Sequence, residues 1–164
     1  MTETSLDTRI RLAFDKFDSA PTSPLLDVLR RRLVAELIGD GDAVADTLAP
    51  GFALTIHGSP DPVTLTRDDL VATVSRQTKT STIVWMEFDS LLTTDSSMAA
   101  NGTLCTLRGS ESILTTMPVG VFLEYLEGLF ISEVAFMAGV PAIEKVDPTA
   151  LPSLESLQAV IATK

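Results

Sequence analysis

The signals for helix and for strand occupy separate parts of this sequence. Amphipathic helical patterns fill most of the first 78 residues, whereas residues 81–137 alternate in polarity or are rich in β-branched and aromatic side chains. Helices that precede a run of strands indicate an α+β domain. We therefore predict a curved antiparallel sheet with helices covering one of its faces.

Four helical segments are expected before the sheet. Residues 5–18 predict a short extra helix, and "SAPTSP" then interrupts the chain with two prolines. The strongest helix runs from Pro24 to Gly39 behind the N-cap residue Ser23. A short helix capped by Asp42 and a longer one opened by Thr66 follow.

The strand patterns are equally local. The segments "STIVWMEFDSLL" and "MAANGTLCTLR" each predict a strand, and "VGVFLEYLEGLFISEVAFMAG" predicts a hairpin that turns at Glu127 and Gly128. With 164 residues and 45% hydrophobic content, the chain suits a single domain with a real core. We expect an N-terminal extension over residues 1–22, the domain over 23–139, and a C-terminal tail with a short helix over 140–164.

The composition excludes several function classes. A formal net charge of −10 argues against nucleic acid and anionic membranes as partners. One cysteine and one histidine are too few for a protein zinc site, and no metal or cofactor is expected. Cys105 lies in an alternating strand, where a buried and inert thiol is usual. Without a disulfide pair, a signal-like segment or a membrane span, a cytoplasmic protein is predicted.

The order of parts in "LIGDGDAVADTLAPGFALTIHGSPDP…TRDDLVATVSRQ", followed by the hairpin "LEYLEGLFISEVAFM", resembles the nuclear transport factor 2-like superfamily. This superfamily includes ketosteroid isomerases and SnoaL-type polyketide cyclases. The resemblance covers about residues 24–138. It implies a cone-shaped sheet, of the cystatin-like α+β barrel type, wrapped around the helices, with an apolar pocket at its mouth.

The resemblance fails where ketosteroid isomerases carry their catalytic groups. Aligned through "GDGDAV" and the "EGL" turn, the tyrosine position is Arg32, the carboxylate base position is Ile56, and the protonated acid position is Gly120. A dienolate mechanism needs a base and two neutral donors. Steroid isomerisation by that route is therefore not expected.

Glu133 and Arg32 are the leading candidates for a site. Glu133 shares strand parity with Ile131, Ala135 and Met137, and the resemblance places that parity toward the pocket. A carboxylate among apolar neighbours needs a partner or a raised pKa, and Arg32 can reach it from the long helix. The alternative is that both charges lie on solvated faces.

His57, the only histidine, is the third catalytic candidate, as a base. Its parity with Ala53 and Thr55, away from Phe52, Leu54 and Ile56, favours a structural histidine at a strand end. Glu87 and Asp89 share a strand face with Trp85, and they form either an acid–base pair or an ordinary solvated face. The candidates for contacting a ligand are Trp85, Phe122, Tyr125, Ala135 and Met137.

Three functions stay open. The first is a cofactor-free isomerase, cyclase, dehydratase or hydrolase for an apolar, oxygen-bearing metabolite, with Glu133 or His57 as base and Arg32 or Tyr125 polarising an oxygen. The second is a non-catalytic protein that binds a small molecule in the same pocket. The third is an interaction module that uses the open sheet face. A homodimer through the sheet is expected, because the convex face needs cover.

Overall fold

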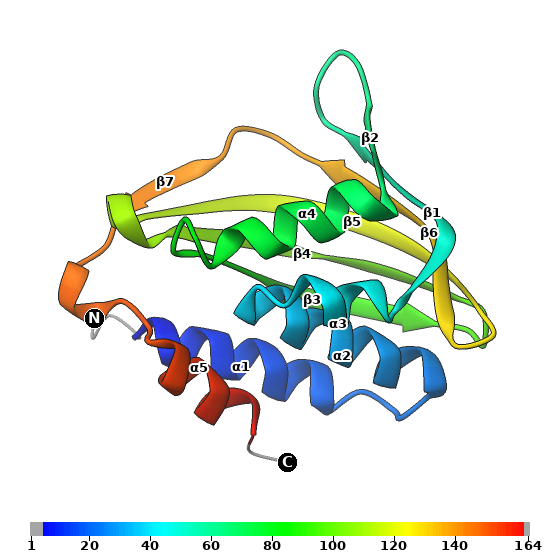
Figure 1. Ribbon diagram of the computed structural model, residues 1–164, viewed down its shortest axis with the longest axis horizontal. Helices are drawn as coiled ribbons and strands as arrows, with labels where there is room; N and C mark the ends of the chain where they lie inside the picture. The colour runs from blue at the N-terminus through cyan, green and yellow to red at the C-terminus, as the bar shows by residue number, and fades with distance from the viewer. Residues whose placement is uncertain (1–4, 163–164) are drawn as a thin grey trace.

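A computed structural model describes residues 5–162 (Figure 1). Residues 1–4 of the expected extension and residues 163–164 of the expected tail lie outside this range. The helices are α1 (Leu6–Asp18), α2 (Pro24–Ile38), α3 (Gly41–Ala45), α4 (Arg67–Gln77) and α5 (Leu154–Ile161). The strands are β1 (Leu48–His57), β2 (Val63–Thr66), β3 (Thr82–Thr93), β4 (Ser97–Arg108), β5 (Ile113–Leu126), β6 (Leu129–Met137) and β7 (Ala142–Lys145).

The strands form one seven-stranded sheet in the order β2-β1-β6-β5-β4-β3, and β7 pairs with β5. Figure 1 shows this sheet arching over the N-terminal helices. The predicted α+β class with a curved sheet is therefore confirmed. All strand pairs are antiparallel except β1 with β6, which are parallel and are connected in the chain through α4 and four strands, β2, β3, β4 and β5.

Capping groups fix both ends of α2, as the sequence predicts. The Ser23 side chain accepts a hydrogen bond from the Leu26 backbone, and Pro24 occupies the first turn. Gly39 ends the helix with a φ of 73°, a left-handed conformation that glycine adopts without strain. The two ends of α2 are thus set by local sequence.

Turn residues also fix the last hairpin. Glu127 and Gly128 have φ values of 50° and 89°, which suit a two-residue turn between β5 and β6. The Thr66 and Asp69 side chains form a reciprocal capping box at the start of α4. The hairpin turn and the start of α4 at Thr66 were predicted from the sequence, whereas the role of Asp69 was not.

The sequence prediction was wrong just after Gly39. Asp40, and not Asp42, caps α3, and this helix ends at Ala45. β1 then begins at Leu48, which is buried against β6 opposite Phe130. The pairing of β1 with β6 shifts register between Leu48 and Ala53, the interval that contains Pro50 and Gly51. This irregularity accommodates a proline that cannot donate to the ladder.

The N-terminal helix and the C-terminal tail pack on the same domain. Ile10 and Phe14 of α1 join Trp85, Leu107 and Leu157 in one apolar cluster. Figure 1 shows α1 and α5 side by side, and the Ser156 hydroxyl donates to Asp7. Both segments therefore close the core at the β3 edge of the sheet.

This packing predicts that α1 contributes to the stability of the whole domain. Ile10 is 0% exposed, so Ile10→Ala should lower the free energy of unfolding in urea by about 2–5 kcal/mol. Leu12, on the outer side of the same helix, is 55% exposed, and Leu12→Ala should change it by less than about 0.5 kcal/mol. An effect of Ile10→Ala as small as that of Leu12→Ala would contradict a contribution of α1 to the stability of the core.

Candidate functional site

A cavity of about 300 Å³ lies between α2, α4 and the face of the sheet that turns toward them. We call this the inner face; it carries Leu54, Val121 and Ala135. Most of the cavity wall is apolar and includes Leu29, Leu70, Val74, Met86 and Leu104. Its volume is at the lower end of the range for small-molecule sites. The space suits a compact apolar ligand.

Strand register brings Glu133 into this cavity. Glu133 lies opposite Leu54 on β1 and opposite Leu123 on β5, so the three side chains share the inner face. Ala135 and Met137 follow at intervals of two and also line the cavity. The parity expected for these three β6 residues is therefore the observed one.

Arg32 of α2 meets Glu133 at one wall of the cavity. The Arg32 side chain is 5% exposed; its Nη2 donates to Glu133 Oε2 over 2.5 Å, and its Nε donates to Glu36 Oε1 over 2.8 Å. The guanidinium carbon lies 5.5 Å from the ring centre of Phe52 and 5.7 Å from that of Phe130. Two carboxylates and two aromatic rings thus surround one buried cation.

The charges in this cluster do not balance when both carboxylates are ionised. Burial, together with the negative charge of Glu36, raises the pKa of Glu133, and the attraction of Arg32 offsets this only in part. Burial also opposes the charge on Arg32, but Glu133 and Glu36 outweigh it and raise the guanidinium pKa. Arg32 therefore stays cationic, and the cluster favours the protonated form of Glu133 more than free solution does.

One donor of the cluster has no protein partner. Nη1 of Arg32 is buried and makes no hydrogen bond within residues 5–162. A buried N–H group without an acceptor is costly, so this atom suits an oxygen supplied by a ligand or by water. The cluster therefore offers a cation donor and a protonatable carboxyl beside an apolar space.

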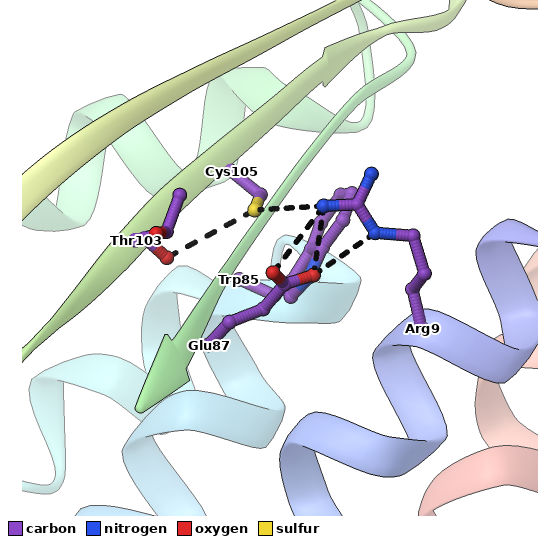
Figure 2. A network of polar contacts seen from close by, with 5 residues as sticks. All are labelled: Arg9, Trp85, Glu87, Thr103 and Cys105. Atoms are coloured by element: carbon purple, nitrogen blue, oxygen red, sulfur yellow. Dashed lines mark hydrogen bonds and ion pairs between the residues drawn. The ribbon is translucent and has the colours of Figure 1, made fainter. Parts of the chain in front are cut away.

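Trp85 contacts the cavity, but its polar atom belongs to another network (Figure 2). Its Nε1 donates to Glu87 over 3.3 Å, and Arg9 of α1 donates to both oxygens of the same carboxylate. Glu87 therefore ties α1 to β3, which supports the structural interpretation of this strand face. Burial, followed by the negative charge of Glu87, raises the pKa of the neighbouring Cys105 thiol to about 12, so this cysteine is inert as expected.

Three predicted site residues do not line the cavity. His57 lies at the end of β1 with its ring stacked on Phe136 at 5.0 Å, on the outer face of the sheet. Phe122 has the parity opposite to Val121 and Leu123 and is 40% exposed on that outer face. Tyr125 follows a register shift in β5 and packs edge-on against Phe130 instead. The structure gives these residues no place in the cavity.

Other lining residues were missed by the sequence analysis. Glu36 lies four residues after Arg32 on the same helix face, a spacing that could have identified it. Phe14 and Phe17 come from α1, which was taken for an appendage, and Gln77 ends α4. No sequence pattern indicates that these segments reach one cavity, because their contacts are non-local.

Residues 5–162 contain neither a metal-binding cluster nor a helix that could cross a membrane. No three His, Cys, Asp or Glu side chains in this range lie close enough together to hold a metal ion. None of the helices described is both long and apolar enough to cross a membrane.

Comparisons with known proteins identify the fold. No protein-family model matches the sequence, and no curated protein matches it significantly. Among solved structures, an LEH-like epoxide hydrolase of M. tuberculosis has a TM-score of 0.59 at 11% identity, covering 85% of this chain and 93% of its own. A protein of Catenulispora acidiphila with a ketosteroid isomerase-like fold, crystallised with trimethylamine, has a TM-score of 0.54 at 11% identity, covering 70% and 85%.

A third structural neighbour is a SnoaL-like protein of Jannaschia sp. CCS1, assigned as a polyketide cyclase. Its TM-score is 0.53 at 12% identity, covering 73% of this chain and 91% of its own. At such low identities, structural likeness defines the fold and no more. The protein has the nuclear transport factor 2-like fold, as the sequence resemblance implied, and its cavity lies between helices and sheet.

The raised pKa of Glu133 predicts a stability that falls with pH. The unfolded chain releases the Glu133 proton near the ordinary value of 4.5, whereas the folded protein holds it to higher pH. Between these two values the folded state binds more protons, so the free energy of unfolding declines as pH rises. As the pH rises from 4 to 8, the free energy of unfolding in urea should decline more for the wild type than for Glu133→Gln. A larger decline for the variant would mean that folding lowers the pKa of Glu133.

Proposed function

We propose that this protein is an acid–base enzyme for a small apolar molecule that carries a neutral oxygen. The observation that carries the proposal is the buried cluster of Glu133, Arg32 and Glu36 at the wall of an apolar cavity. A protein that only bound an apolar ligand would gain nothing from two carboxylates around one buried cation, because desolvating these charges is costly. The cluster instead supplies a proton donor and a proton acceptor to one space.

The reaction that best suits the cluster is the addition of water to an epoxide. An epoxide is apolar and uncharged, and its oxygen needs a proton when the ring opens. Glu133, whose pKa is raised, provides the protonated carboxyl, and the Glu36 side chain, 20% exposed against 11% for Glu133, provides the carboxylate. The likeness of fold to an epoxide hydrolase is consistent with this choice.

The proton transfers balance over one turnover. Glu133 gives its proton to the epoxide oxygen as one carbon–oxygen bond of the ring breaks. A water oxygen forms a new bond to that carbon and loses a proton to Glu36, which leaves a vicinal diol. The unpaired N–H groups on Nη1 of Arg32 hold the oxygen of the epoxide and then of the diol. Proton exchange with solvent resets Glu36 and Glu133.

The test is hydrolysis of cyclohexene oxide and styrene oxide, with the diols measured by chromatography. Glu133→Gln should lower kcat by at least about a hundredfold, because it removes the proton donor and keeps the shape of the side chain. Glu87→Gln is the matched control: Glu87 is also paired with an arginine but is not part of the cavity wall, so kcat should be unchanged. Equal loss in both variants would contradict the assignment.

A wild-type protein that binds these epoxides without forming diol would favour a non-catalytic binding protein. In that case Glu133→Gln should change the affinity for these epoxides, and neither protein should form diol. Binding is measurable through Trp85, the only tryptophan of the chain, because it contacts the cavity.

The expected homodimer stays a proposal, with the outer face of the sheet as its interface. Phe122 and Phe136, 40% and 53% exposed, lie on the neighbouring strands β5 and β6 beside the small residues Gly120 and Ala99. A second copy of this chain would cover both rings. Phe136→Lys should convert the dimer to monomer in sedimentation velocity at micromolar concentration, without changing the far-UV circular dichroism. A monomeric wild type would contradict the proposal.

A further inference from the structure

Gln77 is a polar residue in a position where the helix pattern calls for an apolar one. It follows Leu70 and Val74 at helical spacing on the buried face of α4, and all three residues line the cavity. Gln77 is 8% exposed, and its Oε1 is buried without a hydrogen-bond partner in residues 5–162. A leucine here would fill the same space without an unpaired polar atom.

A buried carboxamide oxygen without a hydrogen-bond partner destabilises the protein. Leaving such a group without its hydrogen bonds costs more than an ordinary hydrogen bond contributes, and native structures rarely do so. A bound molecule that supplies the missing partner would recover this loss. Gln77 therefore marks a place where the ligand carries a polar group.

The cavity then has two separate unpaired groups. Arg32 offers a donor, and Gln77 offers a carboxamide from the other helix. Gln77 also lines a second cavity together with Leu37, five residues beyond Arg32 along α2. The wall around both polar groups is mostly apolar.

We propose that Gln77 is a specificity-determining residue that binds a hydroxyl group of the ligand, remote from the oxygen held by Arg32. A hydroxyl both donates and accepts, so it matches the carboxamide in either orientation of its oxygen and nitrogen. The substrate class is then an apolar skeleton with a reactive oxygen at one end and a hydroxyl at the other. This inference rests on the proposed function, because it deepens the description of the same cavity.

Thr106 is the alternative partner for such a hydroxyl. It lines the cavity from β4 and is only partly buried, so its own hydroxyl can be solvated in the empty protein. Thr73 also lines the cavity, but its hydroxyl already donates to the Asp69 carbonyl over 2.8 Å. Thr106 therefore provides the matched control, since Thr106→Val removes a lining hydroxyl and keeps the shape.

The test compares two unreactive ketones that differ by one hydroxyl: 4-cyclohexylcyclohexanone and 4-(4-hydroxycyclohexyl)cyclohexanone. The ketone oxygen accepts from Arg32, and affinity is measured by Trp85 fluorescence and calorimetry. The hydroxylated ketone should bind wild type about tenfold more tightly. Gln77→Leu should bind the hydroxylated ketone no better than the plain ketone, because the ligand hydroxyl then loses its water without gaining a hydrogen-bond partner. Thr106→Val should keep the tenfold advantage.

The outcomes separate this inference from the proposed function. Equal affinity of both ketones for wild type, or loss of the advantage in Thr106→Val and not in Gln77→Leu, would overturn the role of Gln77 alone. Failure of both ketones to bind wild type would contradict the proposed function and this inference with it. Gln77→Leu should have an unchanged or higher melting temperature, because it removes an unpaired polar group; Gln77→Met replaces it if the leucine variant does not fold.

Discussion

A single buried cation sets the arrangement of the site and of the core around it. Arg32 contacts a carboxylate of its own helix and one on β6, and its guanidinium lies against rings from β1 and β6. An arginine cannot shed its charge when it is buried, so these neighbours must be present before α2 can pack under the sheet. The contacts that anchor α2 are therefore the same ones that position Glu133, and the structural and chemical roles of Arg32 cannot be separated.

Strand register in the sheet places the Glu133 carboxylate beside this cation. Because side chains alternate along each strand, the pairing of Leu54 with Glu133 places the carboxylate inside, whereas a shift of one residue would expose it. The hairpin turn at Glu127 and Gly128 starts the pairing of β5 with β6, and a register shift between Glu124 and Tyr125 then places Glu133 opposite Leu123. The turn and this irregularity together determine which side chains of the two strands reach the cavity.

The sequence predicted the features that depend on local signals. The caps of α2 and α4, the last hairpin and the parity of Glu133 all follow from short segments, and the structure confirms them. It did not predict β2, a short and mostly exposed strand that pairs with the nearby β1. It also did not predict β7 or the packing of α1 into the core, because these depend on contacts between distant segments. For the same reason the sequence did not identify Gln77 and Phe14 as lining residues. Glu36 could have been identified from its helical spacing to Arg32.

The same fold therefore supports different chemistry through the placement of a few side chains. The positions that resemble the catalytic groups of ketosteroid isomerases carry Arg32, Ile56 and Gly120 here. The carboxylate instead lies one strand away, at Glu133, two residues before the partner of Ile56. Replacing a neutral hydrogen-bond donor by a permanent cation changes what the carboxylate can do, because the cation binds the ionised form directly. Burial, with a smaller contribution from the second carboxylate Glu36, outweighs this attraction and raises the pKa of Glu133. The proposed chemistry consequently requires all three charged groups at once, and no one of them would suggest it alone.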